Sequence, residues 1–152
     1  MYIHWEKSLE LGNDLIDLQH RMLVLLCRKL DIAIKTRQPE QTIRWIIVEL
    51  KKFTEFHFTS EENLMHEIGY PSVGEHALIH TELLVQLDMM LAKISHHREF
   101  PEDLLYFLNK WLVQHLAQED MKIVDFLRLA VHRPIGEELY EQYLLAPGRT
   151  KT

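Results

Sequence analysis

Cysteine, glycine and proline are scarce in this sequence. Cys27 is the single cysteine in 152 residues, which excludes an internal disulfide and a zinc site built from cysteines. Five glycines and five prolines occur, where average usage would give about 11 and 8. Few helix-breaking residues in a chain rich in leucine predict long helices.

The chain also lacks an excess of positive charge and any long apolar run. Its net charge is −6, which disfavours a nucleic-acid partner, because binding to a phosphate backbone requires a basic face. No stretch of about 18 apolar residues occurs, and the first residues lack the basic and apolar regions of a signal peptide. The sequence therefore predicts no transmembrane segment and a cytoplasmic location.

Apolar residues recur at helical spacing in four stretches joined by short connections. Asn13 is typical of a helix N-cap, Pro39 of a first helical turn, and Gly69 of a C-cap. Ser72 begins the capping-box pattern Ser-x-x-Glu, and Pro101 suits the start of a last helix. The predicted helices span residues 14–36, 39–69, 73–97 and 101–133.

Long helices with short connections favour an all-α fold, an antiparallel up-down-up-down four-helix bundle. An extended N-terminal arm, residues 1–12, carries Trp5. We expect the bundle domain to span residues 1–130 and a C-terminal extension, with a short helix near 137–145, to span 131–152. The expected buried stripe of the first helix is Leu15, Leu18, Met22, Leu25, Leu26, Leu30 and Ile34, and that of the second is Ile43, Ile46, Ile47, Leu50, Phe53, Phe56 and Leu64.

Ten histidines form the one unusual count in the composition. Each predicted helix places at least one imidazole on or near its apolar side, and His57 shares a helix face with Glu61, four residues later. Unpaired imidazoles in a core would cost several kcal/mol in total, and metal binding would offset that cost. Imidazole with carboxylate suits iron, zinc, copper or nickel. The five histidines of this pattern are His20, His57, His76, His80 and His115.

The other five histidines carry no such pattern, and we expect them to face solvent or to cap helix ends. A bundle that binds no metal and serves only protein interaction is the alternative interpretation of the whole pattern. The five are His4, His66, His96, His97 and His132.

Four short motifs occur in order, one in each predicted helix. The motifs are Ile16-Asp17-Leu18-Gln19-His20, His57-Phe58-Thr59-Ser60-Glu61-Glu62, His76-Ala77-Leu78-Ile79-His80 and His115-Leu116-Ala117-Gln118-Glu119-Asp120. On these motifs, and on Trp5 in the arm, the chain resembles the hemerythrins over residues 1–130, and most closely the bacterial single-domain bacteriohemerythrins.

The resemblance implies a non-heme site of two iron ions. One iron would be bound by His76, His80 and His115, and the other by His20 and His57. Glu61 and Asp120 would bridge both ions together with an oxo or hydroxo group. The apolar dioxygen pocket implied in the same way consists of Leu23, Phe58, Trp111, Leu112 and Leu116.

One spacing fits an ordinary helix poorly. His115 and Asp120 are five residues apart, which is about 140° around an ideal helix. By spacing alone Glu119 is better aligned with His115. The family pattern uses the aspartate, which we choose, and the helix would then be locally loosened.

The function implied by the resemblance is reversible dioxygen binding, for transport, storage or delivery. Its partners would be dioxygen and, for delivery, an enzyme that consumes it. A redox or dioxygen sensor and a di-iron oxidase or peroxidase-like enzyme are the alternatives. The set of five histidines and two carboxylates disfavours an enzyme, because di-iron oxygenases use more carboxylates and paired Glu-x-x-His motifs.

Overall fold

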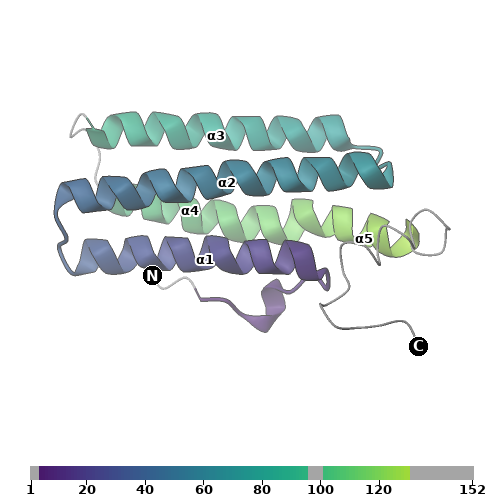
Figure 1. Cartoon of the computed structure of the whole chain (residues 1–152), viewed down its shortest axis with the longest axis horizontal. Helices are drawn as coiled ribbons and strands as arrows, with labels where there is room; N and C mark the ends of the chain where they lie inside the picture. Colours follow the sequence, from purple (N-terminus) through teal and green to yellow (C-terminus); the bar gives the residue numbers. More distant parts are fainter. Residues whose placement is uncertain (1–3, 96–100, 131–152) are drawn as a thin grey trace.

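The computed structural model describes residues 4–95 and 101–130. Four long helical rods lie side by side, and no strand occurs among these residues (Figure 1). Each rod runs opposite to the one before it, which confirms the predicted all-α four-helix bundle. The elements are η1 (Lys7–Leu9), α1 (Asp14–Lys35), α2 (Glu40–Ile68), α3 (Val73–Ser95), α4 (Pro101–Gln114), η2 (His115–Asp120) and α5 (Met121–Ala130).

The predicted helix ends are largely confirmed. The side chain of Asn13 accepts a hydrogen bond from the backbone N–H of Ile16 at 3.0 Å, and therefore caps α1. Gly69 ends α2 in the left-handed conformation, with φ 69°, which glycine adopts without steric cost. Pro39 is the residue before α2 rather than its first residue, one position from the expectation.

The predicted buried stripe of α1 is partly wrong. Leu18, Met22 and Leu25 are 63%, 43% and 54% exposed, and Phe56 of α2 is 58% exposed. The helix is apolar on more than one face, so the 3.6-residue period fits two phases. The structure adopts the phase that also buries polar residues, among them His20. Its apolar members on α1 are Ile16, Leu23, Val24, Leu26, Cys27, Leu30 and Ala33.

The N-terminal arm is fixed to the bundle near the start of α1. The carboxylate of Asp17 accepts hydrogen bonds from the backbone N–H groups of Leu11, at 2.8 Å, and Gly12, at 3.1 Å. Arg128 of α5 donates to the carbonyl oxygen of Leu11 at 2.5 Å. The arm therefore ties together the ends of α1 and α5. It also contains the short 3-10 helix η1, where the sequence predicted an extended segment.

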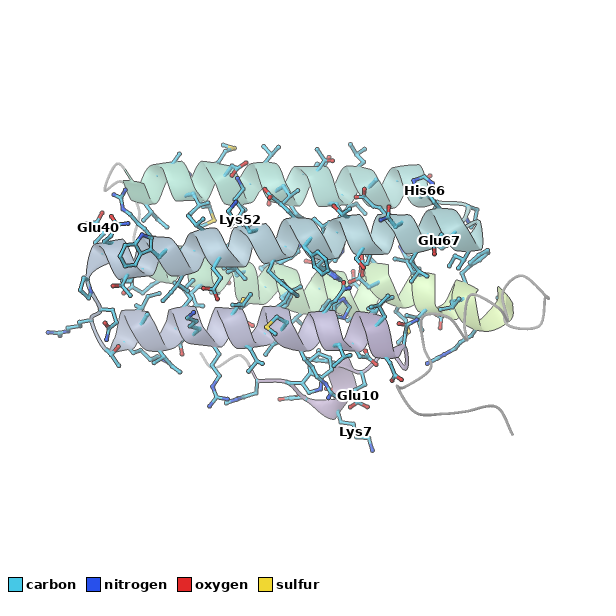
Figure 2. All side chains as sticks on the ribbon, viewed as in Figure 1. Lys7, Glu10, Glu40, Lys52, His66 and Glu67 are labelled. Atoms are coloured by element: carbon cyan, nitrogen blue, oxygen red, sulfur yellow. The ribbon has the colours of Figure 1, made fainter. Side chains whose placement is uncertain are left out.

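Charged side chains lie on the outside of the bundle, among them Glu40, Lys52 and Glu67 on α2 (Figure 2). His4 and His66 are exposed, as expected, whereas His96, His97 and His132 lie outside the described residues. Among the described helices none is long and apolar enough to cross a membrane. The division at residue 130 stays a prediction, because 131–152, with its expected short helix, also lies outside the described part.

Candidate metal centre

The helix that the sequence predicted as continuous from residue 101 contains a π-helical segment, η2, between α4 and α5. In a π-helix the backbone hydrogen bonds join residues five apart, and the turn is wider than in an α-helix. The side chains of His115 and Asp120 therefore face the same direction. Asp120 Oδ1 lies 2.9 Å from His115 Nε2. Glu119 instead points outward to an ion pair with Lys122 at 3.1 Å. The local loosening expected from the five-residue spacing is therefore confirmed.

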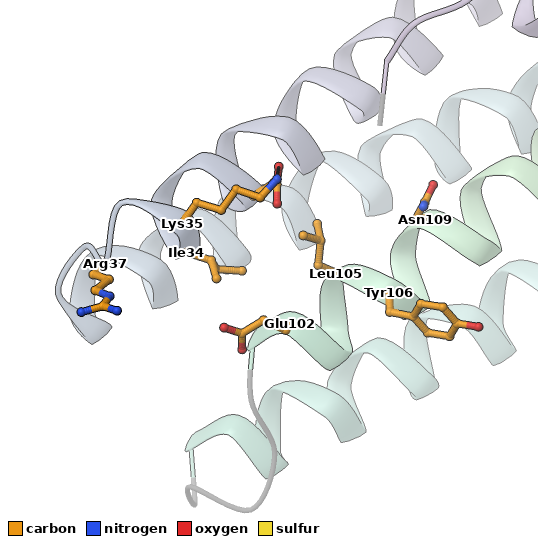
Figure 3. Close-up of a pocket in the computed structure, with 8 residues that line it drawn as sticks. Ile34, Lys35, Arg37, Glu102, Leu105, Tyr106 and Asn109 are labelled. Atoms are coloured by element: carbon orange, nitrogen blue, oxygen red, sulfur yellow. Dashed lines mark hydrogen bonds and ion pairs between the residues drawn. The ribbon is translucent and has the colours of Figure 1, made fainter. Parts of the chain in front are cut away.

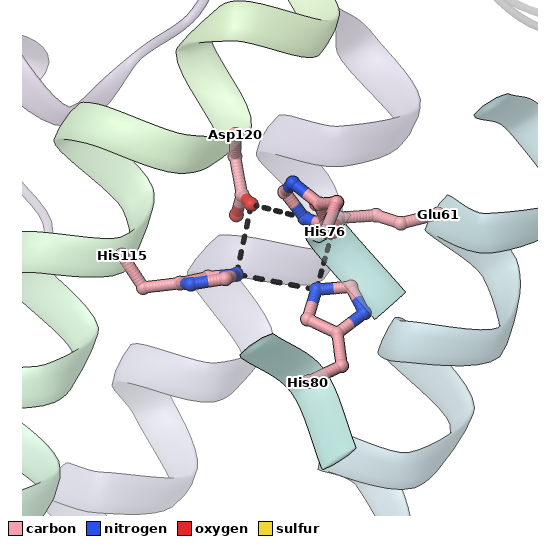
Figure 4. A group of neighbouring side chains, drawn as sticks. All are labelled: Glu61, His76, His80, His115 and Asp120. Carbon is pink, nitrogen blue, oxygen red and sulfur yellow. Dashed lines mark hydrogen bonds and ion pairs between the residues drawn. The ribbon is translucent and has the colours of Figure 1, made fainter. Parts of the chain in front are cut away.

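Seven buried side chains from all four helical rods converge at and beside η2, and Figure 4 shows five of them, Glu61, His76, His80, His115 and Asp120. They form two groups, and within each group the potential ligand atoms lie within 4.8 Å of one another. The two groups share Glu61 and Asp120 and differ in their histidines. The three-histidine group is Glu61, His76, His80, His115 and Asp120, and the two-histidine group is His20, His57, Glu61 and Asp120.

Each of the five imidazoles directs Nε2 toward one or both shared carboxylates. The nitrogen of His20 lies 2.9 Å from Asp120 and 3.5 Å from Glu61, and that of His57 lies 3.3 Å from Glu61. The remaining Nε2-to-carboxylate distances are 3.4 and 3.3 Å from His76 to Glu61 and Asp120, 3.2 Å from His80 to Glu61, and 2.9 Å from His115 to Asp120.

These short distances do not amount to hydrogen bonds for several of the atoms. Nε2 of His20 and of His76, and both oxygens of Glu61 and of Asp120, are buried without a hydrogen-bond partner. Ligands about 2.1 Å from one metal ion, at right angles to each other, would be about 3.0 Å apart. Separations of 2.9–3.5 Å with lone pairs that do not point at N–H groups therefore suit metal ions between the side chains.

The carboxylates and the imidazoles alter each other's pKa. Burial lowers the pKa of His20 and of His76, but the carboxylates of Asp120 and Glu61 outweigh it and raise both to about 9. Burial disfavours the charged forms of Glu61 and Asp120, yet the surrounding imidazoles hold the pKa of both well below the usual range. Both carboxylates are therefore ionised, as metal ligands must be.

His57 differs from these histidines. Burial lowers the pKa of His57 to about 4, and the nearby Glu61 does not compensate. A neutral imidazole is the form that binds a metal. By contrast, Cys27 lies in the apolar core, where burial raises its pKa to about 12, so its thiol is not an available ligand.

Two polar residues that sequence reasoning did not assign contact the outer ring nitrogens of the site. Gln19 Oε1 lies 2.7 Å from His57 Nδ1, and Glu62 Oε1 lies 3.0 Å from His80 Nδ1. Each is adjacent in sequence to a candidate ligand, but its partner is on another helix. Metal-binding histidines usually donate their second ring N–H to such an acceptor. That rule could have directed sequence reasoning to polar residues beside the candidate ligands.

Two aromatic rings contact the histidines, and three buried leucines lie in the adjoining core cluster. Phe58 stacks on His80 with ring centroids 3.8 Å apart, and Trp111 lies over His115 at 5.8 Å. Phe58 also meets the Trp111 ring edge-on at 5.8 Å. The two aromatic residues expected to line a dioxygen pocket thus lie beside the three-histidine group, and the pocket itself stays a prediction. Its three leucines, Leu23, Leu112 and Leu116, are each 1% exposed and belong to one core cluster.

Two of the cavities along α4 differ clearly in their linings. A cavity of about 190 Å³ is lined by Trp111 and His115, and so adjoins the site. The larger one, of about 510 Å³, lies between the C-terminal end of α1 and the N-terminal end of α4 (Figure 3). Charged residues such as Lys35 and Glu102 line it, and no histidine does, so it is separate from the metal centre.

Comparison with known proteins agrees with this geometry. Residues 11–127 match the model of the hemerythrin family, described as the hemerythrin HHE cation binding domain. A bacteriohemerythrin of Clostridium acetobutylicum is 30% identical over 126 residues, which is 80% of this chain and 98% of that protein. A bacteriohemerythrin of Campylobacter jejuni is 29% identical over 122 residues, or 80% of this chain and 92% of that protein.

The matched region contains every side chain of the two ligand groups, from His20 to Asp120. It begins at Leu11, where the arm meets α1, and ends at Leu127 in α5. A chain with this bundle, this cluster of buried histidines and carboxylates, and this match over most of its length belongs to the hemerythrin family.

Proposed function

We propose that this protein binds dioxygen reversibly at a pair of iron ions, for transport, storage or delivery. The single observation that supports this most strongly is the sharing of Glu61 and Asp120 between two groups of buried histidines. In di-iron bundles, carboxylates that project into the core between the helices serve the paired metal ions. His76, His80 and His115 would hold one ion, and His20 and His57 the other. An oxo or hydroxo bridge belongs to the proposal as well.

The donor set favours iron in this proposal. Five imidazoles and two carboxylates with no thiolate suit a hard-to-borderline divalent ion rather than copper(I). Two ferrous ions bound there would supply the electrons that dioxygen accepts when it binds. The relatives named above are bacteriohemerythrins, which supports iron over zinc.

The protein itself would contribute ligands, orientation and dryness. Neutral His57 presents Nε2 to the site because Gln19 accepts at its other ring nitrogen. Leu23, Leu112 and Leu116 are each 1% exposed and would keep water out of this part of the core. Apolar surroundings that exclude water limit the escape of charged products of dioxygen reduction. This favours reversible binding over catalytic turnover.

A binding protein is favoured over an oxidase or peroxidase-like enzyme. Both carboxylates of the cluster are used as shared ligands, which leaves neither to act as a general acid or base. We include a cytoplasmic setting and a dioxygen-consuming partner enzyme in the proposal. The first is supported by the single, buried cysteine, since disulfides are rare in reducing compartments.

The test is a visible spectrum of ferrous-loaded protein, recorded without air, after air, and after removal of dioxygen over several cycles. We expect absorbance that appears with air and disappears with argon. The variant His57→Ala should lose this response, whereas His66→Ala, which changes an exposed histidine on the same helix, should keep it. Absorbance that never reverses, with steady formation of hydrogen peroxide, would favour the enzyme instead.

A further inference from the structure

Two of the five candidate ligand histidines make a polar contact on the ring nitrogen that faces away from the site. Nδ1 of His57 lies 2.7 Å from Gln19 Oε1, and Nδ1 of His80 lies 3.0 Å from Glu62 Oε1. An amide oxygen and a carboxylate oxygen only accept hydrogen bonds. Each Nδ1 therefore carries the hydrogen and donates it, which leaves the Nε2 lone pair directed at the shared carboxylates.

The Gln19 amide is also hydrogen-bonded to a third residue, Ser60. Gln19 Nε2 donates to Ser60 Oγ at 2.8 Å, so the amide oxygen faces His57. Gln19 is 8% exposed, and Ser60 follows His57 by three residues on α2. A flipped amide would place its N–H groups against the N–H of His57 and lose that contact. The three side chains thus form one hydrogen-bonded chain between α1 and α2.

The two acceptors differ in charge. Gln19 is neutral and contacts a member of the two-histidine group. Glu62 is a carboxylate, with a side chain 33% exposed, and contacts a member of the three-histidine group. A charge-assisted hydrogen bond is roughly twice as strong as a neutral one. A carboxylate acceptor therefore increases the electron density that the imidazole donates to a metal more than an amide does.

We propose that Gln19 and Glu62 are positioning residues that make the two metal positions unequal, so that the three-histidine position binds its ion more tightly and fills first. The inference rests on the proposed function, because it requires two ions. Three histidines against two already favour the same order. We add that the charge of the outer acceptor strengthens this preference. Exchanging the two acceptors should therefore bring the dissociation constants of the two metal positions closer together.

The exchange needs only isosteric substitutions. Glu62→Gln keeps the shape of the side chain and removes its charge, and Gln19→Glu does the reverse. The hydroxyl of Ser60 can rotate and donate to a carboxylate at position 19. Glu67→Gln is the matched control, because Glu67 is exposed on the same helix and its change alters net charge equally (Figure 2).

The experiment titrates metal-free protein with cobalt(II) against a competing chelator and follows the visible absorbance of the bound ion. Unmodified protein should show two dissociation constants. Glu62→Gln should raise the smaller dissociation constant, that of the three-histidine position, by about 10-fold or more. Loss of a hydrogen-bond partner of a metal-binding histidine typically costs about 10–100-fold in metal affinity. Gln19→Glu should lower the larger dissociation constant, that of the two-histidine position. The double variant should bring the two constants closer together. Circular dichroism checks that each variant folds.

The titration distinguishes failure of the two-metal function from failure of the role proposed for Gln19 and Glu62. Binding of a single cobalt ion to the unmodified protein would refute the two-metal function itself. Two ions with constants that both exchanges leave within twofold, as in Glu67→Gln, would refute only the role of the acceptors. If Gln19→Glu does not fold, Ser60→Ala serves instead, since it removes the hydrogen-bond partner that anchors the Gln19 amide beside His57. It should weaken the two-histidine position alone, and equal weakening of both would overturn the proposal.

Discussion

The contact between the N-terminal arm and α5 gives a stability prediction whose size follows from the structure. Gly12 has φ +87°, in the region that residues with a side chain rarely adopt. A β-carbon added there would lie 2.5 Å from Nη2 of Arg128, which hydrogen-bonds the carbonyl oxygen of Leu11. The substitution Gly12→Ala therefore strains the backbone and also displaces the guanidinium group.

The two effects have separate magnitudes. A left-handed conformation costs an L-residue about 1–2 kcal/mol. The hydrogen bond of Arg128 contributes about 1 kcal/mol, since the side chain is 56% exposed and solvent weakens the interaction. Gly12→Ala should therefore lower the free energy of unfolding by about 2–3 kcal/mol. For a chain of this length that corresponds to a melting temperature lower by about 5–10 °C.

Urea unfolding of metal-free protein, followed by circular dichroism, measures this loss. Gly74→Ala is the control, because a β-carbon at this position in α3 meets nothing within 4 Å. It should be neutral or stabilising by up to about 1 kcal/mol. In an Arg128→Ala background, Gly12→Ala should cost only the backbone strain. An equal loss in both backgrounds would show that Arg128 is not displaced, and no loss in either would refute the reasoning.

Two further predictions concern the metal centre. In metal-free protein, His20 and His76 have pKa values raised to about 9, so the stability they add is present below pH 6.5 and is lost as the pH rises through 9. The pKa of His57, lowered to about 4, makes stability fall as the pH drops from 6.5 to 4. The free energy of unfolding, measured with urea, should therefore be greatest near pH 6.5. A free energy that stays constant from pH 6.5 to 9 would contradict the raised pKa values of His20 and His76. Leu23→Ala should cost about 2–5 kcal/mol because the side chain is 1% exposed, yet iron content should be unchanged and the air-dependent absorbance should decay faster, as it should in Trp111→Ala. Loss of iron from Leu23→Ala in elemental analysis would contradict a purely apolar role.

The helix ends were predictable because their signals are local. Asn13 and Gly69 act through backbone groups three or four residues away, so their residue types alone indicate where α1 begins and α2 ends. The convergence of the histidines was predictable for a related reason. Helical spacing places His57 and Glu61 on one face, and a bundle has only one core for such faces to share.

Other features depend on contacts that no local pattern contains. The phase of α1 was mistaken at Leu18 and Leu25 because leucines occur on two faces of that helix. The contact of Gln19 with His57 depends on the register between α1 and α2, which spacing within one helix does not determine. The π-helical segment η2 was indicated only by the five-residue interval from His115 to Asp120.

The central claim is that the two ligand groups hold two metal ions in each chain. Elemental analysis of protein reconstituted with ferrous iron without air, and freed of unbound metal, tests it directly when the protein concentration is measured on the same sample. The account predicts two irons per chain, and fewer than two in both His57→Ala and His80→Ala. A ratio of one iron per chain in the unmodified protein, or two irons retained when either histidine is removed, would contradict it.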